Sequence, residues 1–184
     1  MDANKELIEA KIYFASGQLE RSVKAFSDAE EKGCDVVDVC LSRGAVLMAL
    51  GKYEEAKVDF SRVLKEDNDN ERAYYFRGIA LFALGHYERA IEDLTLSLTR
   101  NNNRGIAHLA RGMAYAELGQ EEYASLDLNS ATAFSSAEFK SFKKLFGKLP
   151  APFTKTRELM AKENAPWNNL LNRDSAQQLL DLLN

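Results

Sequence analysis

Apolar residues recur three or four positions apart along most of the chain, in two short stretches on either side of a glycine. One such pattern places Leu81 and Phe82 before Gly85, and Ile91 and Leu94 after it. This spacing is typical of one face of an α-helix. A glycine between the two stretches supplies the left-handed backbone conformation at which a helix readily ends. The pattern therefore predicts a pair of antiparallel helices, here termed the first and second helix of a unit.

The pattern repeats with a fixed period of 34 residues, which is marked by Gly17, Gly51, Gly85 and Gly119. A period of this length is the signature of stacked repeats. A small residue stands seven positions before the marker glycine, and a large apolar residue stands nine positions after it. The small residue lets two helices approach closely, and the large one fills the space between them. The small residues are Ala10, Gly44, Gly78 and Gly112, and the large ones are Phe26, Phe60, Leu94 and Leu128. The predicted units are 3–36, 37–70, 71–104 and 105–138.

These features resemble the tetratricopeptide repeat family over residues 3–138. The resemblance is carried by the small and large residues above, by Tyr13 and Tyr115 within first helices, and by Tyr53 and Tyr87 after the marker glycine. The family's closing proline is missing from every unit. The resemblance implies an all-α fold, an α-solenoid of four antiparallel helix pairs that coil into a right-handed superhelix.

The helical pattern continues for one helix beyond the fourth unit, at residues 136–147. We expect this helix to cap the open end of the solenoid domain, 3–147, although a basic amphipathic helix can also lie on an acidic membrane. Pro150 and Pro152 then mark a turn out of the solenoid. The sequence pattern of residues 148–184 predicts a helical tail with a leucine-rich end.

Three arginines stand one position before the small glycine of their unit, and each has an aspartate sixteen residues later. The pairs are Arg43 and Asp59, Arg77 and Asp93, and Arg111 and Asp127. The first unit lacks both residues. A half-buried guanidinium needs a carboxylate, which it can bind through two parallel hydrogen bonds. We predict structural ion pairs; a row of ligand-binding arginines is the alternative.

By resemblance to the family, the first helix of each unit lines the concave side of the superhelix. We predict a peptide-binding groove there, made of Leu7, Phe14, Leu41, Met48, Arg72, Tyr75, Phe76, Ile79, Phe82, Leu109 and Met113. Chaperone-binding members of the family clamp a carboxylate with Lys, Asn and Arg at set groove positions, and among the matching positions here only Arg72 has a suitable charge at a basic position. The predicted function is a protein–protein interaction module, an adaptor or scaffold, that binds an apolar peptide or an amphipathic helix.

Three alternatives remain for this groove. The protein could be a chaperone specific for apolar segments of a substrate protein. The groove could instead be filled by the C-terminal tail, either the chain's own, as autoinhibition, or a neighbour's, in a homodimer. In the last alternative the tail packs only on the final repeat and the groove is narrow.

Composition and charge exclude several other classes of protein. A net charge of −4 is unfavourable for nucleic-acid binding, and no apolar run is long enough for stable membrane insertion. The N-terminus lacks a secretory signal, so we expect a cytoplasmic protein in which Cys34 and Cys40 are thiols. His86 and His108 lack metal-ligand spacing, and there is no glycine-rich phosphate loop. We expect no enzyme activity and no cofactor or metal.

Overall fold

The computed structural model describes residues 3–132, 155, 156 and 158, and for residues 3, 4 and 132 it describes the backbone only. The predicted capping helix 136–147 lies outside the described residues, as does the predicted tail 148–184 apart from three residues. The described residues up to 132 form eight α-helices and no strand. They are α1 (Ala3–Ala15), α2 (Leu19–Glu31), α3 (Val36–Ala49), α4 (Tyr53–Glu66), α5 (Glu71–Ala83), α6 (Tyr87–Arg100), α7 (Gly105–Glu117) and α8 (Glu121–Thr132).

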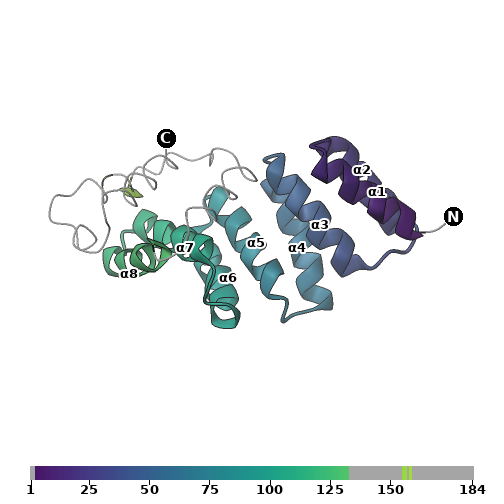
Figure 1. Ribbon diagram of the computed structural model, residues 1–184. Coiled ribbons are helices and arrows are strands. Elements are labelled where there is room, and N and C mark those ends of the chain that lie inside the picture. The colour runs from purple at the N-terminus through teal and green to yellow at the C-terminus, as the bar shows by residue number, and fades with distance from the viewer. Residues whose placement is uncertain (1–2, 133–154, 157, 159–184) are drawn as a thin grey trace.

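The helices form four pairs that stack side by side in chain order (Figure 1). Within the described repeats, successive first helices also contact one another: α1 meets α3, α3 meets α5, and α5 meets α7. In this described part of the chain, successive second helices approach one another less closely, although Arg62 of α4 pairs with Glu30 of α2. The first helices are therefore on the inner, concave side of an all-α solenoid. This is the fold class that the 34-residue period predicts.

Each first helix ends where the sequence places its marker glycine, and Gly85 shows why. Its φ of +79° is a conformation that residues with a side chain rarely adopt. The Gly85 N–H donates to the Phe82 carbonyl at 3.0 Å, and the His86 N–H donates to the Leu81 carbonyl at 2.9 Å. These two bonds are those of a Schellman motif, which satisfies the last carbonyls of a helix. The motif turns the chain sharply into the next helix.

A second set of glycines brings the two helices of a unit into close contact. A Cβ atom placed on Gly78 would lie 2.8 Å from Cγ of Leu94, and one on Gly44 would lie 2.5 Å from the Phe60 ring. Phe60 and Leu94 are fully buried. The small and the large residue of a unit thus contact each other across the helix pair. The large side chain occupies the space that a side chain at the glycine would need.

We predict that Gly78→Ala destabilises the protein by about 1–3 kcal/mol, because overpacking against Leu94 outweighs the higher helix propensity of alanine. In a Leu94→Ala background the same substitution should cost less than about 1 kcal/mol, because the truncated side chain leaves room for the new methyl group. Urea unfolding of the four proteins of this cycle measures both costs. If Gly78→Ala costs the same stability in both backgrounds, Gly78 and Leu94 are not in contact.

Candidate functional site

Each of the three predicted arginine–aspartate pairs lies between the first and second helix of its own unit. The Nε atom of Arg77 donates to Oδ2 of Asp93 at 2.6 Å, and its Nη2 atom donates to Oδ1 at 2.9 Å. Arg43 makes the same two bonds to Asp59 at 2.8 and 2.7 Å, and Arg111 makes them to Asp127 at 2.6 and 2.8 Å. All three aspartates are buried. The structure therefore brings together the residues that the sequence paired.

The third nitrogen of each guanidinium reaches back to the preceding unit. Nη1 donates to a hydroxyl sixteen residues earlier in the chain, at distances of 2.9 to 3.2 Å; the acceptors are Ser27 for Arg43, Ser61 for Arg77 and Thr95 for Arg111. We call these three arginines, with their aspartates and hydroxyls, the arginine ladder. The sequence analysis missed the hydroxyls. Their signal was a hydroxyl at the same position of the first three units, where the fourth has Asn129.

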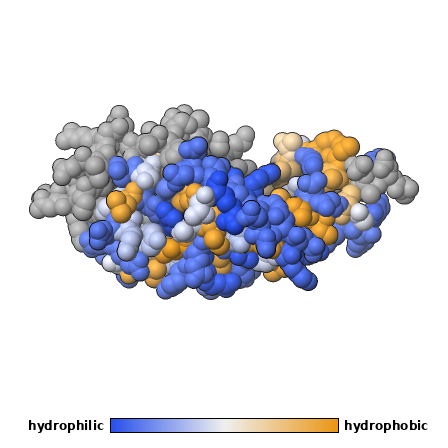
Figure 2. Space-filling model, turned by 90° about the horizontal axis from the view of Figure 1, so that it is seen from below, coloured by the Kyte–Doolittle hydropathy of each residue, from blue (hydrophilic) through white to orange (hydrophobic). Residues whose placement is uncertain are grey.

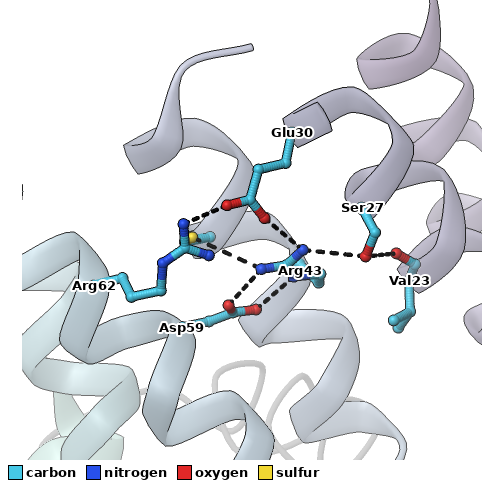
Figure 3. Close-up of polar contacts among 7 residues, drawn as sticks. Val23, Ser27, Glu30, Arg43, Asp59 and Arg62 are labelled. Atoms are coloured by element: carbon cyan, nitrogen blue, oxygen red, sulfur yellow. Dashed lines mark hydrogen bonds and ion pairs between the residues drawn. The ribbon is translucent and has the colours of Figure 1, made fainter. Parts of the chain in front are cut away.

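The part of the arginine ladder around Arg43 extends into a larger network, shown in Figure 3. Glu30 of α2 accepts from Nη1 of Arg43 at 2.8 Å and also pairs with Arg62 of α4. The hydrogen bond from Arg62, with further help from Arg43, holds the pKa of Glu30 below its usual range. Residues of three helices from two units therefore meet around a single carboxylate.

The electrostatics of the arginine ladder favour a structural role. Hydrogen bonding to the paired aspartate raises the pKa of Arg43 and of Arg77 above the ordinary arginine value. Burial of Asp127 opposes its ionisation, but hydrogen bonds from Arg111 and His108 outweigh burial and lower its pKa. Every guanidinium nitrogen of the ladder has a protein partner. A ligand would have to displace one of these partners to bind there.

We predict that Asp93→Ala lowers the stability by about 3 kcal/mol, because it leaves the guanidinium of Arg77 half-buried without its carboxylate. Glu92→Ala, an exposed substitution on the same helix, should change stability by less than about 0.5 kcal/mol and serves as the control. Thermal unfolding followed by circular dichroism compares the two variants. An unchanged melting temperature in Asp93→Ala would rule out the structural interpretation.

The lowered pKa of Asp127 also predicts a dependence of stability on pH. Its contribution is complete above the pKa of an unfolded aspartate, about 3.9, and is lost as the pH falls through the lower folded pKa. Asp127→Asn should therefore flatten the loss of stability below about pH 4, by up to about 1.4 kcal/mol per pH unit. Urea midpoints measured from pH 7 to pH 2.5 test this, with the exposed Glu122→Gln as control. A slope identical to that of the wild type would count against the assignment.

The residues predicted to form the groove differ greatly in exposure. Arg72 is exposed, and Leu7, Phe14, Leu41 and Phe76 are partly buried. The remaining six are buried: Met48, Tyr75, Ile79, Phe82, Leu109 and Met113. The peptide-binding groove therefore stays a prediction, and five of its eleven predicted residues keep some exposed surface. The six buried side chains belong to the main core cluster, where the side chains of neighbouring units pack together.

Exposure falls along the concave face from the N-terminal to the C-terminal units. At the ninth position of the unit, Lys11 is exposed and Ala45 is partly buried, whereas Ile79 and Met113 are 0% and 2% exposed. The fifth position changes in the same way, from Leu7 and Leu41 to the buried Tyr75 and Leu109. The open part of the concave face is thus its N-terminal half. A second view of the molecule, from below, shows a mainly hydrophilic face whose largest apolar area lies toward the N-terminal units (Figure 2).

Two described residues from beyond the repeats reach the concave face. Thr156 is fully buried, and its backbone N–H and its hydroxyl both donate to Oε1 of Glu117, at 3.0 and 2.7 Å. The Lys155 ammonium donates to the backbone carbonyl of Glu117 at 2.8 Å. Glu117 is the last residue of α7 and occupies one of the groove positions of the fourth unit. The sequence analysis did not pair Glu117 with either of the other two residues.

The described residues offer no constellation that indicates catalysis. They contain no group of three or more His, Cys, Asp or Glu side chains arranged to hold a metal ion. Burial raises the pKa of the Cys40 thiol to about 11, so it is not an activated nucleophile. His108 contacts Asp127 at 2.9 Å, within the arginine ladder. In the part of the chain that the structure describes, no helix has the length and apolar character needed to cross a membrane.

Comparison with known proteins agrees with this architecture. Residues 47–111 match the family model of the tetratricopeptide repeat. A sequence comparison with curated proteins gives no match. Among solved structures, MamA from Desulfovibrio magneticus RS-1 is 20% identical with a TM-score of 0.69, over 98% of this chain and 94% of that one.

Two further solved structures give the same result. MamA of AMB-1 is 23% identical with a TM-score of 0.65, over 77% of this chain and 79% of that one. YrrB, described as a repeat protein of this family with an unusual peptide-binding site, is 21% identical with a TM-score of 0.65, over 99% of this chain and 84% of that one. At these identities the likeness shows the fold. Residues 47–111 thus match the tetratricopeptide repeat, and the chain has the fold of an all-α solenoid of this repeat type.

Proposed function

We propose that this protein is a protein–protein interaction module whose concave face binds an apolar segment of a partner, as an amphipathic helix or an extended peptide. The observation that carries the proposal is the partly exposed apolar surface of four predicted groove residues on first helices, Leu7, Phe14, Leu41 and Phe76. A concave surface of this kind suits the helix-in-groove mode of recognition, in which apolar anchors three or four residues apart enter a groove. The peptide-binding site named for YrrB supports this proposal by analogy of fold.

The N-terminal half of the face is where we expect a partner to make first contact. Leu7, Phe14 and Leu41 keep part of their apolar surface in water, and Ile8 beside them is 59% exposed. Burying such surface is the main source of affinity in an apolar interface, at about 25 cal/mol per Å². Arg72, exposed at the groove edge of the third unit, adds a cation that a carboxylate of the partner can meet.

A chaperone that holds apolar segments of a substrate would use the same surface. It differs from an adaptor in binding the unfolded form of the partner. The experiment that identifies the partner therefore also separates these two functions, because the captured form can be probed for structure.

We predict that a photo-crosslinking amino acid at Leu7 or Leu41 captures a partner in cells, because both side chains face the concave side and are accessible. The matched controls are Val58 on α4 and Leu96 on α6, which are exposed apolar residues on second helices. They should give no adduct with the same partner. Adducts from Val58 or Leu96 alone, identified by mass spectrometry, would place binding elsewhere and contradict the proposal.

A further inference from the structure

We infer that the solenoid has a second docking surface on its convex side, which binds a basic amphipathic helix of a partner protein. This surface is an apolar patch of four residues with exposed carboxylates around it. Its members are Ile91 on α6, Tyr115 on α7, and Tyr123 and Leu126 on α8, here termed the convex patch. The groove of the proposed function lies on the concave face, so this inference goes beyond that function and does not depend on it.

The repeat places these four residues side by side. Their counterparts two units earlier line a hollow of about 300 Å³ beside Arg43; they are Val23, Leu47, Glu55 and Val58. Arg111 makes the same ladder bonds as Arg43, so α6, α7 and α8 have the arrangement of α2, α3 and α4. The rings of Tyr115 and Tyr123 lie 5.3 Å apart, in agreement with this arrangement. The convex patch therefore lies between two second helices, α6 and α8, which both contact α7 (Figure 1).

Two members of the convex patch are strongly exposed. Tyr123 is 57% exposed and Leu126 is 62% exposed. Their counterparts Glu55 and Val58 line the hollow beside α2, so Tyr123 and Leu126 lie toward α6, within the array of repeats. Their exposure is therefore not that of a surface left open at the end of the described repeats. Exposed apolar side chains that adjoin one another are typical of interaction sites.

The middle of the solenoid shows that the fold does not need apolar residues at these positions. The counterparts one unit earlier are Lys57, Leu81, Arg89 and Glu92, and three of these four are charged. Arg77 nevertheless makes the same ladder bonds there, so α4, α5 and α6 are held together in the same way. The packing of the repeats thus does not require Ile91, Tyr123 or Leu126 to be apolar.

Three carboxylates surround the convex patch. Glu88 and Glu92 lie on α6, each within one helical turn of Ile91. Glu122 lies one turn before Leu126 on α8. All three are exposed, and no residue in the described part of the chain forms an ion pair with any of them. Their charges are therefore available to a cationic partner.

These carboxylates select among the occupants that an apolar patch could have. A second copy of the chain would bring the same three carboxylates against them, because a symmetric dimer uses the same surface on both subunits. An anionic membrane and nucleic acid are repelled in the same way. A helix with a stripe of apolar residues flanked by Lys or Arg matches both the apolar centre and the charges around it. The partner is therefore a basic amphipathic helix.

The test uses the purified full chain and two labelled synthetic helices, whose binding is followed by fluorescence anisotropy. Both helices carry leucine at i, i+3, i+4 and i+7, and their other positions are lysine in one and glutamate in the other. In Leu126→Gln we expect the dissociation constant of the lysine helix to rise about tenfold, because an apolar anchor of the interface is lost. Val58→Gln, similarly exposed on α4, should leave it within about twofold of the wild-type value.

The role of the carboxylates is tested separately from that of the apolar residues. The double substitution Glu92→Gln and Glu122→Gln should weaken binding of the lysine helix severalfold at low ionic strength. This difference from the wild type should shrink as salt is added, because salt screens charges at an exposed surface. The glutamate helix should be insensitive to Leu126→Gln, since the carboxylates keep it from the convex patch.

Four outcomes would overturn the inference. The first two are a lysine helix that fails to bind the wild type, and one that binds Leu126→Gln equally well. The third is a glutamate helix whose affinity falls as much in Leu126→Gln, because the carboxylates then select no charge. The fourth is a dimer in light scattering that dissociates in Leu126→Gln, which would assign the convex patch to a second copy of the chain.

Leu126→Gln should keep the helix content of the wild type in circular dichroism, because the substitution is exposed. A change in binding therefore reports on the convex patch itself. The crosslinking experiment at Leu7 and Leu41 is independent of all these results, so the two proposals can fail separately.

Discussion

Each guanidinium of the arginine ladder divides its donors between two units. Two nitrogens bind the aspartate of its own second helix, and the third binds a hydroxyl of the preceding second helix. One side chain thereby fixes the angle between the helices of a pair and the position of that pair on its neighbour. The glycine contacts at Gly44 and Gly78 depend on both, because a helix that shifts by a fraction of an ångström loses or overfills the space opposite Phe60 or Leu94. The guanidinium bonds of the arginine ladder therefore link the units, and the apolar contacts within each unit depend on these bonds.

The fold could be predicted from the sequence because the repeat gives each residue a phase. Gly85 marks a helix end, and Gly78 and Leu94 mark a contact between two helices. An arginine and an aspartate at the positions of Arg77 and Asp93 occur together in the last three units and are both missing from the first. The hydroxyls of the ladder were missed because a serine such as Ser61 on a helix reads as a surface residue. The exposure of the groove residues could not be predicted for a different reason. Periodicity says which way Ile79 or Met113 points, but it contains no information about what lies opposite.

The concave face combines a partly open apolar half with a buried one, and this arrangement reduces the risk of aggregation. A continuous exposed apolar groove favours aggregation. On the third and fourth units Tyr75, Ile79, Leu109 and Met113 are buried, which keeps this part of the apolar surface from water.

The first unit lacks a step of its own in the ladder, since Glu9 and Ala25 stand where the other units have arginine and aspartate. Apolar packing of Phe26 with Val39 and Val46 joins it to the second unit. Polar bonds add to this packing, from Arg43 to Ser27 and Glu30 and from Arg62 to Glu30. Under mechanical tension applied to the N-terminus, this interface would bear the load first. The array would then open from that end, one unit at a time, and the released first helix would carry Leu7 and Phe14 away from the groove. Tension along the chain could thus act on the proposed binding surface without any contact to the partner.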